Sequence, residues 1–228
     1  MTKLTWLGHG SWLIETPDHR VLLDPFFTDN PSAKASPNDF QDVSHILISH
    51  GHFDHVADAA EIANASGATL VAIFEIAQWF ASNHEVQNTV GMNIGGNLEL
   101  PFGSIQMTPA VHSSQLPDGS YGGEAAGFVL TIDRKRIYFA CDTALFTDMK
   151  VYAQSVDVAV LPIGDLFTMG IEDSVAATRL IEARKVLPAH YGTWPPIEQD
   201  AQHWADRIRK ETSAEPIVLS VGASMEVS

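Results

Sequence analysis

The chain has 228 residues, 45% of them hydrophobic, and carries a formal net charge of −15 from 28 acidic and 13 basic residues. This length and apolar content suffice for one large domain or two fused halves. The acidic excess argues against nucleic acid or an anionic membrane surface as a partner, because both would be repelled.

The composition also bears on the compartment and the partners. The single cysteine, Cys141, excludes an internal disulfide and fits a reducing environment. The first residues enter a strand pattern directly, without the apolar core and cleavage site of a signal peptide. No apolar run approaches the roughly 18 residues of a membrane span. We therefore expect a cytoplasmic protein that acts on a small molecule, with a homo-oligomer compatible with the sequence.

The N-terminal third begins with strands. Residues 4–7 and 11–16 alternate between apolar and polar positions, with Gly8, His9 and Gly10 between them. A third apolar run at residues 21–23 ends at Asp24, and together the three predict a β-meander. Residues 26–40 are rich in proline, asparagine, aspartate and serine, which predicts a surface loop long enough to wall or cover a pocket.

The next segment holds the densest group of metal-binding side chains. An apolar run at residues 46–48 predicts a buried strand and residues 56–63 predict a helix; His50, His52, Asp54 and His55 lie between them. Imidazole and carboxylate groups in one strand-to-helix turn suit divalent transition metals, zinc first. His50 and His52 can converge on one ion if the turn is extended, while Asp54 and His55 face a second. A polar loop with surface histidines is the alternative, disfavoured because three histidines in six positions are rare.

The rest of the chain alternates between strand and helix patterns. We predict strands at residues 68–73, 97–100, 104–109, 127–132, 136–140, 156–161 and 186–189, and helices at 75–83, 145–153, 171–183 and 198–210. Residues 91–96 predict a glycine-rich turn, and residues 217–221 and 224–227 a final strand pair. The order predicts one domain, residues 1–228, made of two similar halves (roughly 1–110 and 111–228) packed sheet to sheet with helices outside.

Four predicted strands end in a side chain that can bind a metal: His50, His112, Asp142 and His190. Strand ends can meet at one rim of a sheet sandwich, where the sheets hold side chains rigidly. Alone, His112 or His190 would more often be structural. Beside the histidine-rich turn, each becomes a partner needed to fill two coordination shells.

The HxHxDH motif at residues 50–55, followed in order by His112, Asp142 and His190, resembles the metallo-β-lactamase superfamily over nearly the whole chain. Further motifs resemble a narrower group of compact bacterial and archaeal metal-dependent hydrolases related to the ascorbate-6-phosphate lactonase. These motifs are Gly8-His9, Asp24-Pro25, His112-Ser113-Ser114, Asp142-Thr143 and residues 163–170.

The resemblance implies an α+β fold, a four-layer αββα sandwich of the metallo-β-lactamase type, with two divalent metal ions. The ligands would be His50, His52 and His112 for the first metal, Asp54, His55 and His190 for the second, and Asp142 as a bridge. Zinc is expected, and manganese, iron, nickel or cobalt would fit the same donors. Cys141 stands where the family commonly has glycine; neighbours on a strand point to opposite faces, so we expect a packed thiol that does not bind metal.

Two metals would lower the pKa of a shared water, which favours a metal-dependent hydrolase acting on a small ester, lactone, thioester or phosphoester. Asp54 is the expected catalytic residue, orienting that water or carrying its proton. Di-iron reductases of the superfamily carry glutamate in place of His52, so hydrolysis is favoured over redox chemistry. Specificity is assigned to the loops at residues 26–40 and 115–124.

Further side chains are assigned by position alone. Asp24 is expected to brace a ligand histidine from behind. Candidates to line the pocket or support the ligands are His9, Asp165, Thr168, Tyr191 and Thr193, and surface positions are expected for His19, His45, His84 and His203.

Two other functions remain open. A nuclease-type phosphodiesterase is disfavoured by the charge of −15 and the lack of a basic arm. A non-catalytic, metal-stabilised binding protein is disfavoured because structural zinc sites are usually closed cages of four ligands. A β-lactamase role is disfavoured by the lack of an export signal.

Overall fold

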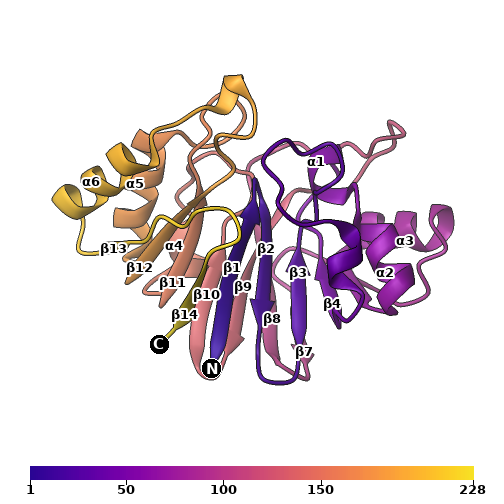
Figure 1. Ribbon diagram of the computed structural model, residues 1–228. Coiled ribbons are helices and arrows are strands. Elements are labelled where there is room, and N and C mark those ends of the chain that lie inside the picture. The colour runs from indigo at the N-terminus through magenta and orange to yellow at the C-terminus, as the bar shows by residue number, and fades with distance from the viewer.

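Two seven-stranded sheets form the centre of the computed structural model, which describes all residues from 1 to 228 (Figure 1). The first sheet has the order β14-β1-β2-β3-β4-β5-β6 and mixes antiparallel pairs, up to β3, with parallel ones. Its strands are β1 (Thr2–Gly8), β2 (Ser11–Glu15), β3 (Arg20–Leu23), β4 (His45–Leu47), β5 (Thr69–Ile73), β6 (Thr89–Met92) and β14 (Ser224–Val227).

The second sheet has the order β13-β12-β11-β10-β9-β8-β7. It is antiparallel from β7 to β10 and parallel from β10 to β13. Its strands are β7 (Asn97–Leu100), β8 (Gly103–Pro109), β9 (Ala126–Ile132), β10 (Lys135–Phe139), β11 (Val158–Pro162), β12 (Lys185–Ala189) and β13 (Glu215–Pro216).

Helices lie outside both sheets, so the expected four-layer αββα architecture is confirmed. Figure 1 shows α1–α3 on one side of the sheets and α4–α6 on the other. Their bounds are α1 (Phe53–Val56), α2 (Ala59–Ser66), α3 (Phe74–Asn83), α4 (Met149–Ala153), α5 (Ile171–Ile181) and α6 (Ala201–Glu211), with short 3₁₀ turns η1 (Pro37–Phe40) and η2 (Pro195–Ile197). No helix has both the length and the apolar character to span a bilayer.

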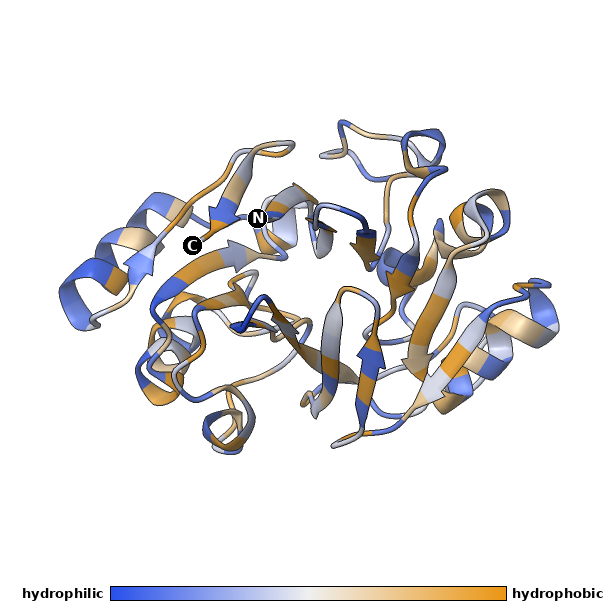
Figure 2. Cartoon of the chain, turned by 90° about the horizontal axis from the view of Figure 1, so that it is seen from below, coloured by the Kyte–Doolittle hydropathy of each residue, from blue (hydrophilic) through white to orange (hydrophobic).

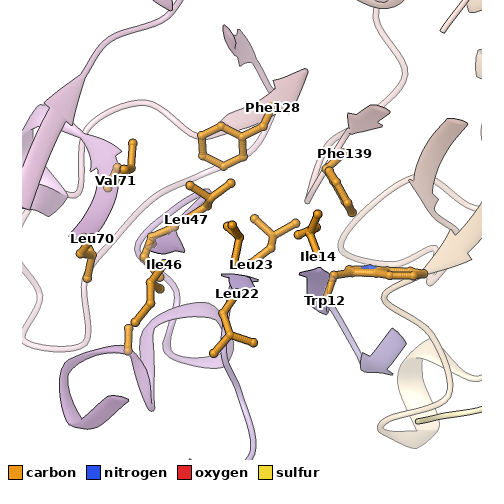
Figure 3. Close-up of a cluster of buried hydrophobic side chains, with 14 of the residues drawn as sticks. Trp12, Ile14, Leu22, Leu23, Ile46, Leu47, Leu70, Val71, Phe128 and Phe139 are labelled. Atoms are coloured by element: carbon orange, nitrogen blue, oxygen red, sulfur yellow. The ribbon is translucent and has the colours of Figure 1, made fainter. Parts of the chain in front are cut away.

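The sheets pack face to face through a dense apolar core. Figure 3 shows Ile14, Leu23 and Leu47 of the first sheet pointing toward Phe128 and Phe139 of the second. Neighbouring positions on the same strands point to the opposite face, as the two-residue period of a strand requires. Hydrophobic residues accordingly run through the strands of both sheets, and hydrophilic residues colour the peripheral helices (Figure 2). This core fixes the relative position of the two sheet edges.

Several sequence-based expectations are corrected. Residues 217–221 form no strand; β14 pairs instead with the N-terminal strand, Thr2 opposite Val227. β6, in the region expected to be a glycine-rich turn, was missed. The chain passes from the first sheet to the second between Met92 and Asn97. These contacts depend on partners far along the chain, so local patterns do not reveal them.

One histidine prediction was also wrong. His45 is buried, at 8% exposure, where a surface position was expected. Its ring packs edge-on against Phe102, with ring centroids 5.0 Å apart, and lies beside His19. His203 is exposed, and His19 and His84 are half-buried.

Candidate metal centre

Loops at one end of the two sheets gather the metal-binding side chains; α1 lies at this end, away from the chain termini (Figure 1). These loops follow β3, β4, β8, β10 and β12. Non-glycine residues with a left-handed backbone at this end include His9 (φ 54°), Asp24 (φ 47°), Cys141 (φ 54°) and His190 (φ 52°). Such conformations cost free energy and tend to occur at functional sites. They turn the chain sharply at the strand ends, where the cluster is built.

The first group of donors consists of His50, His52 and His112, the three histidines that the sequence assigns to one ion. Nδ1 of His52 lies 3.0 Å from Nε2 of His50 and 3.3 Å from Nε2 of His112. Their donor atoms all lie within 4.8 Å of one another. Three imidazole nitrogens that converge in this way match the nitrogen donor set of a zinc-type ion.

Neighbouring side chains fix the tautomer of His50. Ser49 Oγ donates a hydrogen bond to Asp24 Oδ2 (2.5 Å), so it accepts one from Nδ1 of His50 (2.9 Å). This leaves the lone pair of His50 Nε2 for a metal. His52 Nε2 lies 3.2 Å from Ser113 Oγ, on the side of the ring away from the group. Hydrogen bonds to the far ring nitrogen are the usual means of orienting a metal-binding histidine.

The second group contains Asp54, His55 and His190, joined by His9. His55 Nδ1 donates to Asp24 Oδ2 (2.9 Å), so Nε2 is the ring nitrogen that a metal could bind. Nε2 of His55 and both ring nitrogens of His190 are buried without an aligned hydrogen-bond partner. Buried polar atoms are normally satisfied, so these orphaned nitrogens fit a cation bound between them.

Asp142 lies between the two groups. Its Oδ2 is 3.0 Å from His190 Nε2 and 3.4 Å from His55 Nε2 in the second group. The same oxygen is 3.7 Å from His112 Nε2 and 3.9 Å from His50 Nε2 in the first. No other carboxylate is placed this close to both groups, so Asp142 has the geometry of a shared ligand.

His9 is fully buried and contacts Asp54. Its Nδ1 lies 2.8 Å from Thr193 Oγ1 and its Nε2 lies 2.9 Å from Asp54 Oδ2. Because a carboxylate only accepts, Nε2 carries the proton and Nδ1 accepts from the threonine hydroxyl. His9 and Thr193 therefore hold Asp54 in place, which fits their assignment to the pocket or ligand support.

The remaining candidates lie less close to the cluster. Tyr191 stacks on Trp6, with ring centroids 5.2 Å apart. Asp165 is exposed and Thr168 is half-buried; both lie in a turn that Met169 joins to Thr143 by donating its N–H to the Thr143 carbonyl (2.9 Å).

Cys141 belongs to none of the groups of metal-competent side chains, which are the two described above and a third formed by Asp24, His50 and His55. Its Sγ lies 3.7 Å from the Phe139 carbonyl oxygen, to which the thiol donates. Burial, together with Asp24 and Asp142, raises the pKa of this thiol well above its ordinary value, so it stays protonated. The geometry agrees with the expected packed thiol.

The two groups differ in charge state. Burial lowers the pKa values of His50, His52 and His112, so these rings are neutral at neutral pH. Burial alone would also lower the pKa values of His55 and His190, but nearby carboxylates outweigh it. Asp142 above all raises the pKa of His190 to about 9 and that of His55 well above its ordinary value. The second group thus holds protons that a cation must displace.

We therefore expect metal binding to depend on pH in two steps. The first group accepts a cation in weakly acid solution, whereas the second gains affinity as pH rises toward about 9. The gain is about tenfold per pH unit for each proton released. Chelator competition from pH 6 to 9, with proton release measured in buffers of different ionisation enthalpy, checks this. Two equivalents bound with pH-independent affinity would contradict it.

Two supporting residues were not foreseen. Ser49 links Asp24 to His50, and Trp194 packs its ring 4.9 Å from that of His9. Ser49 directly precedes His50, and a hydroxyl group beside a histidine at a strand end could have indicated this supporting role. Trp194 gave none, because its contact depends on the path of the loop after β12.

Comparison with known proteins adds to this geometry. The model of the "Beta-lactamase superfamily domain" family matches residues 19–191. The chain is 43% identical over 231 residues to a UPF0173 metal-dependent hydrolase of Pyrococcus abyssi, covering all of both chains. It is similar to the structure of Igni18, a metallo hydrolase from Ignicoccus hospitalis (TM-score 0.88, 33% identity, 100% of this chain and 99% of that one). A metallo-β-lactamase fold protein of Bacillus subtilis shares the fold (TM-score 0.77, 12% identity, 98% of both chains).

Proposed function

Because the chain belongs to the UPF0173 metal-dependent hydrolase family of the metallo-β-lactamase superfamily, we propose that it hydrolyses a small ester, lactone, thioester or phosphoester at a dinuclear centre. The observation that carries the proposal is the place of Asp142 Oδ2, within 3.9 Å of a nitrogen in each histidine group. A single structural ion would not need a carboxylate shared between two open donor sets.

The ligands would be His50, His52 and His112 on one side and Asp54, His55 and His190 on the other, with Asp142 shared. When bound, paired divalent cations, zinc first, supply a water nucleophile at neutral pH and Lewis-acid polarisation of the substrate oxygen. The protein positions these donors rigidly at the strand ends. Asp24 and Ser49 hold the ligand histidines in the tautomer that leaves one nitrogen free.

Asp54 is proposed as the catalytic residue that orients the attacking water or carries its proton. Its carboxylate accepts a hydrogen bond from His9, and its pKa is lowered despite burial because histidines surround it. It is therefore ionised, so it could accept a proton from the water and could not donate one first.

Asp54→Asn is expected to lower kcat by about 100-fold, the usual scale for a general base. The amide keeps the shape of the side chain and cannot accept the proton. Steady-state kinetics and metal content of the same preparation check this. Unchanged turnover with intact metal content would remove the catalytic role from Asp54.

The direct test of the function combines metal analysis with a substrate panel. Purified protein is expected to hold two divalent ions per chain and to hydrolyse members of an ester, lactone and phosphodiester series. His52→Ala is expected to lose metal and activity together, whereas His203→Ala, which removes an exposed histidine of α6, keeps both. Equal activity in the wild type and His52→Ala would discard the hydrolase assignment.

Further proposals concern the setting of the enzyme. We propose that it is cytoplasmic, acts on a small molecule without nucleic-acid or membrane partners, and can form a homo-oligomer. We also propose that this hydrolase group is related, as a family, to the ascorbate-6-phosphate lactonase. The mirrored order of antiparallel and parallel pairs in the two sheets supports the proposal of one domain with two similar halves.

A further inference from the structure

Phe53 places an exposed aromatic ring at the metal centre. It lies between His52 and Asp54 and is 57% exposed. Phe26 contacts it edge-on and Trp194 lies tilted beside it, each with ring centroids 6.0 Å away. The ring is therefore held in place before any ligand arrives, which reduces the entropy lost on binding.

Other exposed apolar side chains flank the ligands. Val111, which precedes His112, is 53% exposed. Leu166 and Phe167 are 67% and 56% exposed, and lie in the turn joined to Thr143, next to Asp142. Exposed apolar groups gathered around a polar centre indicate a binding surface.

Phe53 also lines a groove of about 920 Å³. Its apolar walls include Phe26, Val56, Trp79 and Phe80, and the carboxylates of Asp29, Glu61 and Asp118 also line it. A second cavity of about 390 Å³ reaches the ligand His112 and is lined by Tyr121, Glu124 and several serines. No lysine or arginine lines either one.

The loops that carry the ligands are equally free of basic side chains. Residues 49–58, 110–124, 140–148, 163–170 and 189–198 contain no lysine or arginine, and the chain carries a net charge of −15. A phosphate or carboxylate on the substrate, away from the reacting group, would meet carboxylates and no cationic side chain. Such a like-charge environment rejects anionic ligands.

We infer that the substrate is an uncharged carboxylic ester, lactone or thioester whose apolar arm lies against Phe53 in the groove of about 920 Å³. The inference rests on the proposed hydrolase function and narrows it, excluding sugar phosphates and coenzyme A thioesters. In the reaction, water adds to the acyl carbon and the bond to the leaving oxygen or sulfur breaks. The leaving atom takes up the proton that the water gives up.

Hydroxamic acids can test the binding of an apolar arm without any reaction, because their head group binds metal ions. Metal-loaded protein is titrated calorimetrically with acetohydroxamic acid, octanohydroxamic acid and the monohydroxamic acid of suberic acid, which adds a carboxylate to the same eight-carbon chain. Octanohydroxamic acid is expected to bind at least tenfold more tightly than acetohydroxamic acid, since each fully buried methylene is worth up to about fourfold. The monohydroxamic acid of suberic acid is expected to bind at least tenfold more weakly than octanohydroxamic acid. High salt is expected to restore part of this affinity, because it screens the repulsion between carboxylates.

Variants of the groove residues test where the apolar chain of the hydroxamic acid binds. Phe53→Ser and, independently, Trp79→Ser, two substitutions of residues that line the groove, are expected to reduce the preference for octanohydroxamic over acetohydroxamic acid by about fivefold or more. Phe74→Ser is the matched control, because Phe74 is 54% exposed but packs on Gly91 at the start of α3. Metal content is measured for each variant, so that a lost ion is not mistaken for a lost arm contact.

The outcomes separate the inference from the function. Equal binding of the three hydroxamates, or faster hydrolysis of 6-phosphogluconolactone than of δ-decalactone, would overturn the inference and leave the hydrolase intact. A different result would assign the surface around Phe53 to contact with a second copy of the chain. In that case the protein would show no preference for octanohydroxamic acid, and Phe53→Ser would convert a homo-oligomer to a monomer. This result would also overturn the inference. If no panel substrate is turned over, the proposed function fails, while the hydroxamate comparison still decides what the groove binds.

Discussion

Asp142→Ala is expected to abolish binding of both metal ions and to lower kcat/KM by a factor of about 1000 or more, about 4 kcal/mol in the barrier. The reason is position: Asp142 Oδ2 lies 3.0 Å from His190 Nε2 and 3.7 Å from His112 Nε2, one in each donor group. Its loss also removes the main charge that raises the pKa of His190. Metal content by mass spectrometry and steady-state kinetics measure the two effects.

Asp165→Ala is the control that separates the loss of any negative charge from the loss of the carboxylate at position 142. Asp165 follows the neighbouring strand β11 but is exposed. Asp165→Ala removes one negative charge from the same end of the sheets and is expected to leave metal content unchanged. An Asp142→Ala protein that keeps two ions with unaltered affinity would show that the ions are not shared through this carboxylate.

Asp24→Asn is the second substitution with a large expected effect, although Asp24 is assigned to hold the ligand histidines and not to bind the metal. Oδ1 accepts from the Ser49 N–H (2.8 Å), while Oδ2 accepts from Ser49 Oγ and from His55 Nδ1 (2.9 Å). An asparagine that keeps the first bond turns its NH₂ toward the other two donors. The expected result is a 10- to 100-fold loss of metal affinity, with about 1–3 kcal/mol less stability from the unsatisfied groups.

Asp58→Asn supplies the comparison for a buried carboxylate without a role in the centre. Asp58 accepts from the backbone N–H groups of Phe27 and Thr28 and from the Thr28 hydroxyl, and it touches no ligand. This variant is expected to lose stability in urea unfolding while metal affinity stays constant. If Asp24→Asn and Asp58→Asn prove alike in chelator competition, Asp24 serves the fold and not the ligands.

The sequence alone was enough to propose the donors, because their signal is local or regular. Histidines at positions 50, 52 and 55 in one strand-to-helix turn need no tertiary contact to be noticed, and His112, Asp142 and His190 each follow an apolar run. Apolar alternation likewise predicted most strands and the layered fold, since the two-residue period reflects which face is buried. Element ends and short strands such as β6 were less well predicted.

Tertiary structure alone decided which side chains meet across long separations. The link from Thr193 through His9 to Asp54 joins three distant segments, and the bond from Asp24 to His55 spans 31 residues. β14 returns to pair with β1 across the full length of the chain, and His45 is buried by Phe102. Such contacts are set by how two sheets pack over a shared core, a property that a short window of sequence does not contain. The sequence therefore predicted which residues are candidate metal ligands, whereas the tertiary structure determined their tautomers, charge states and supporting partners.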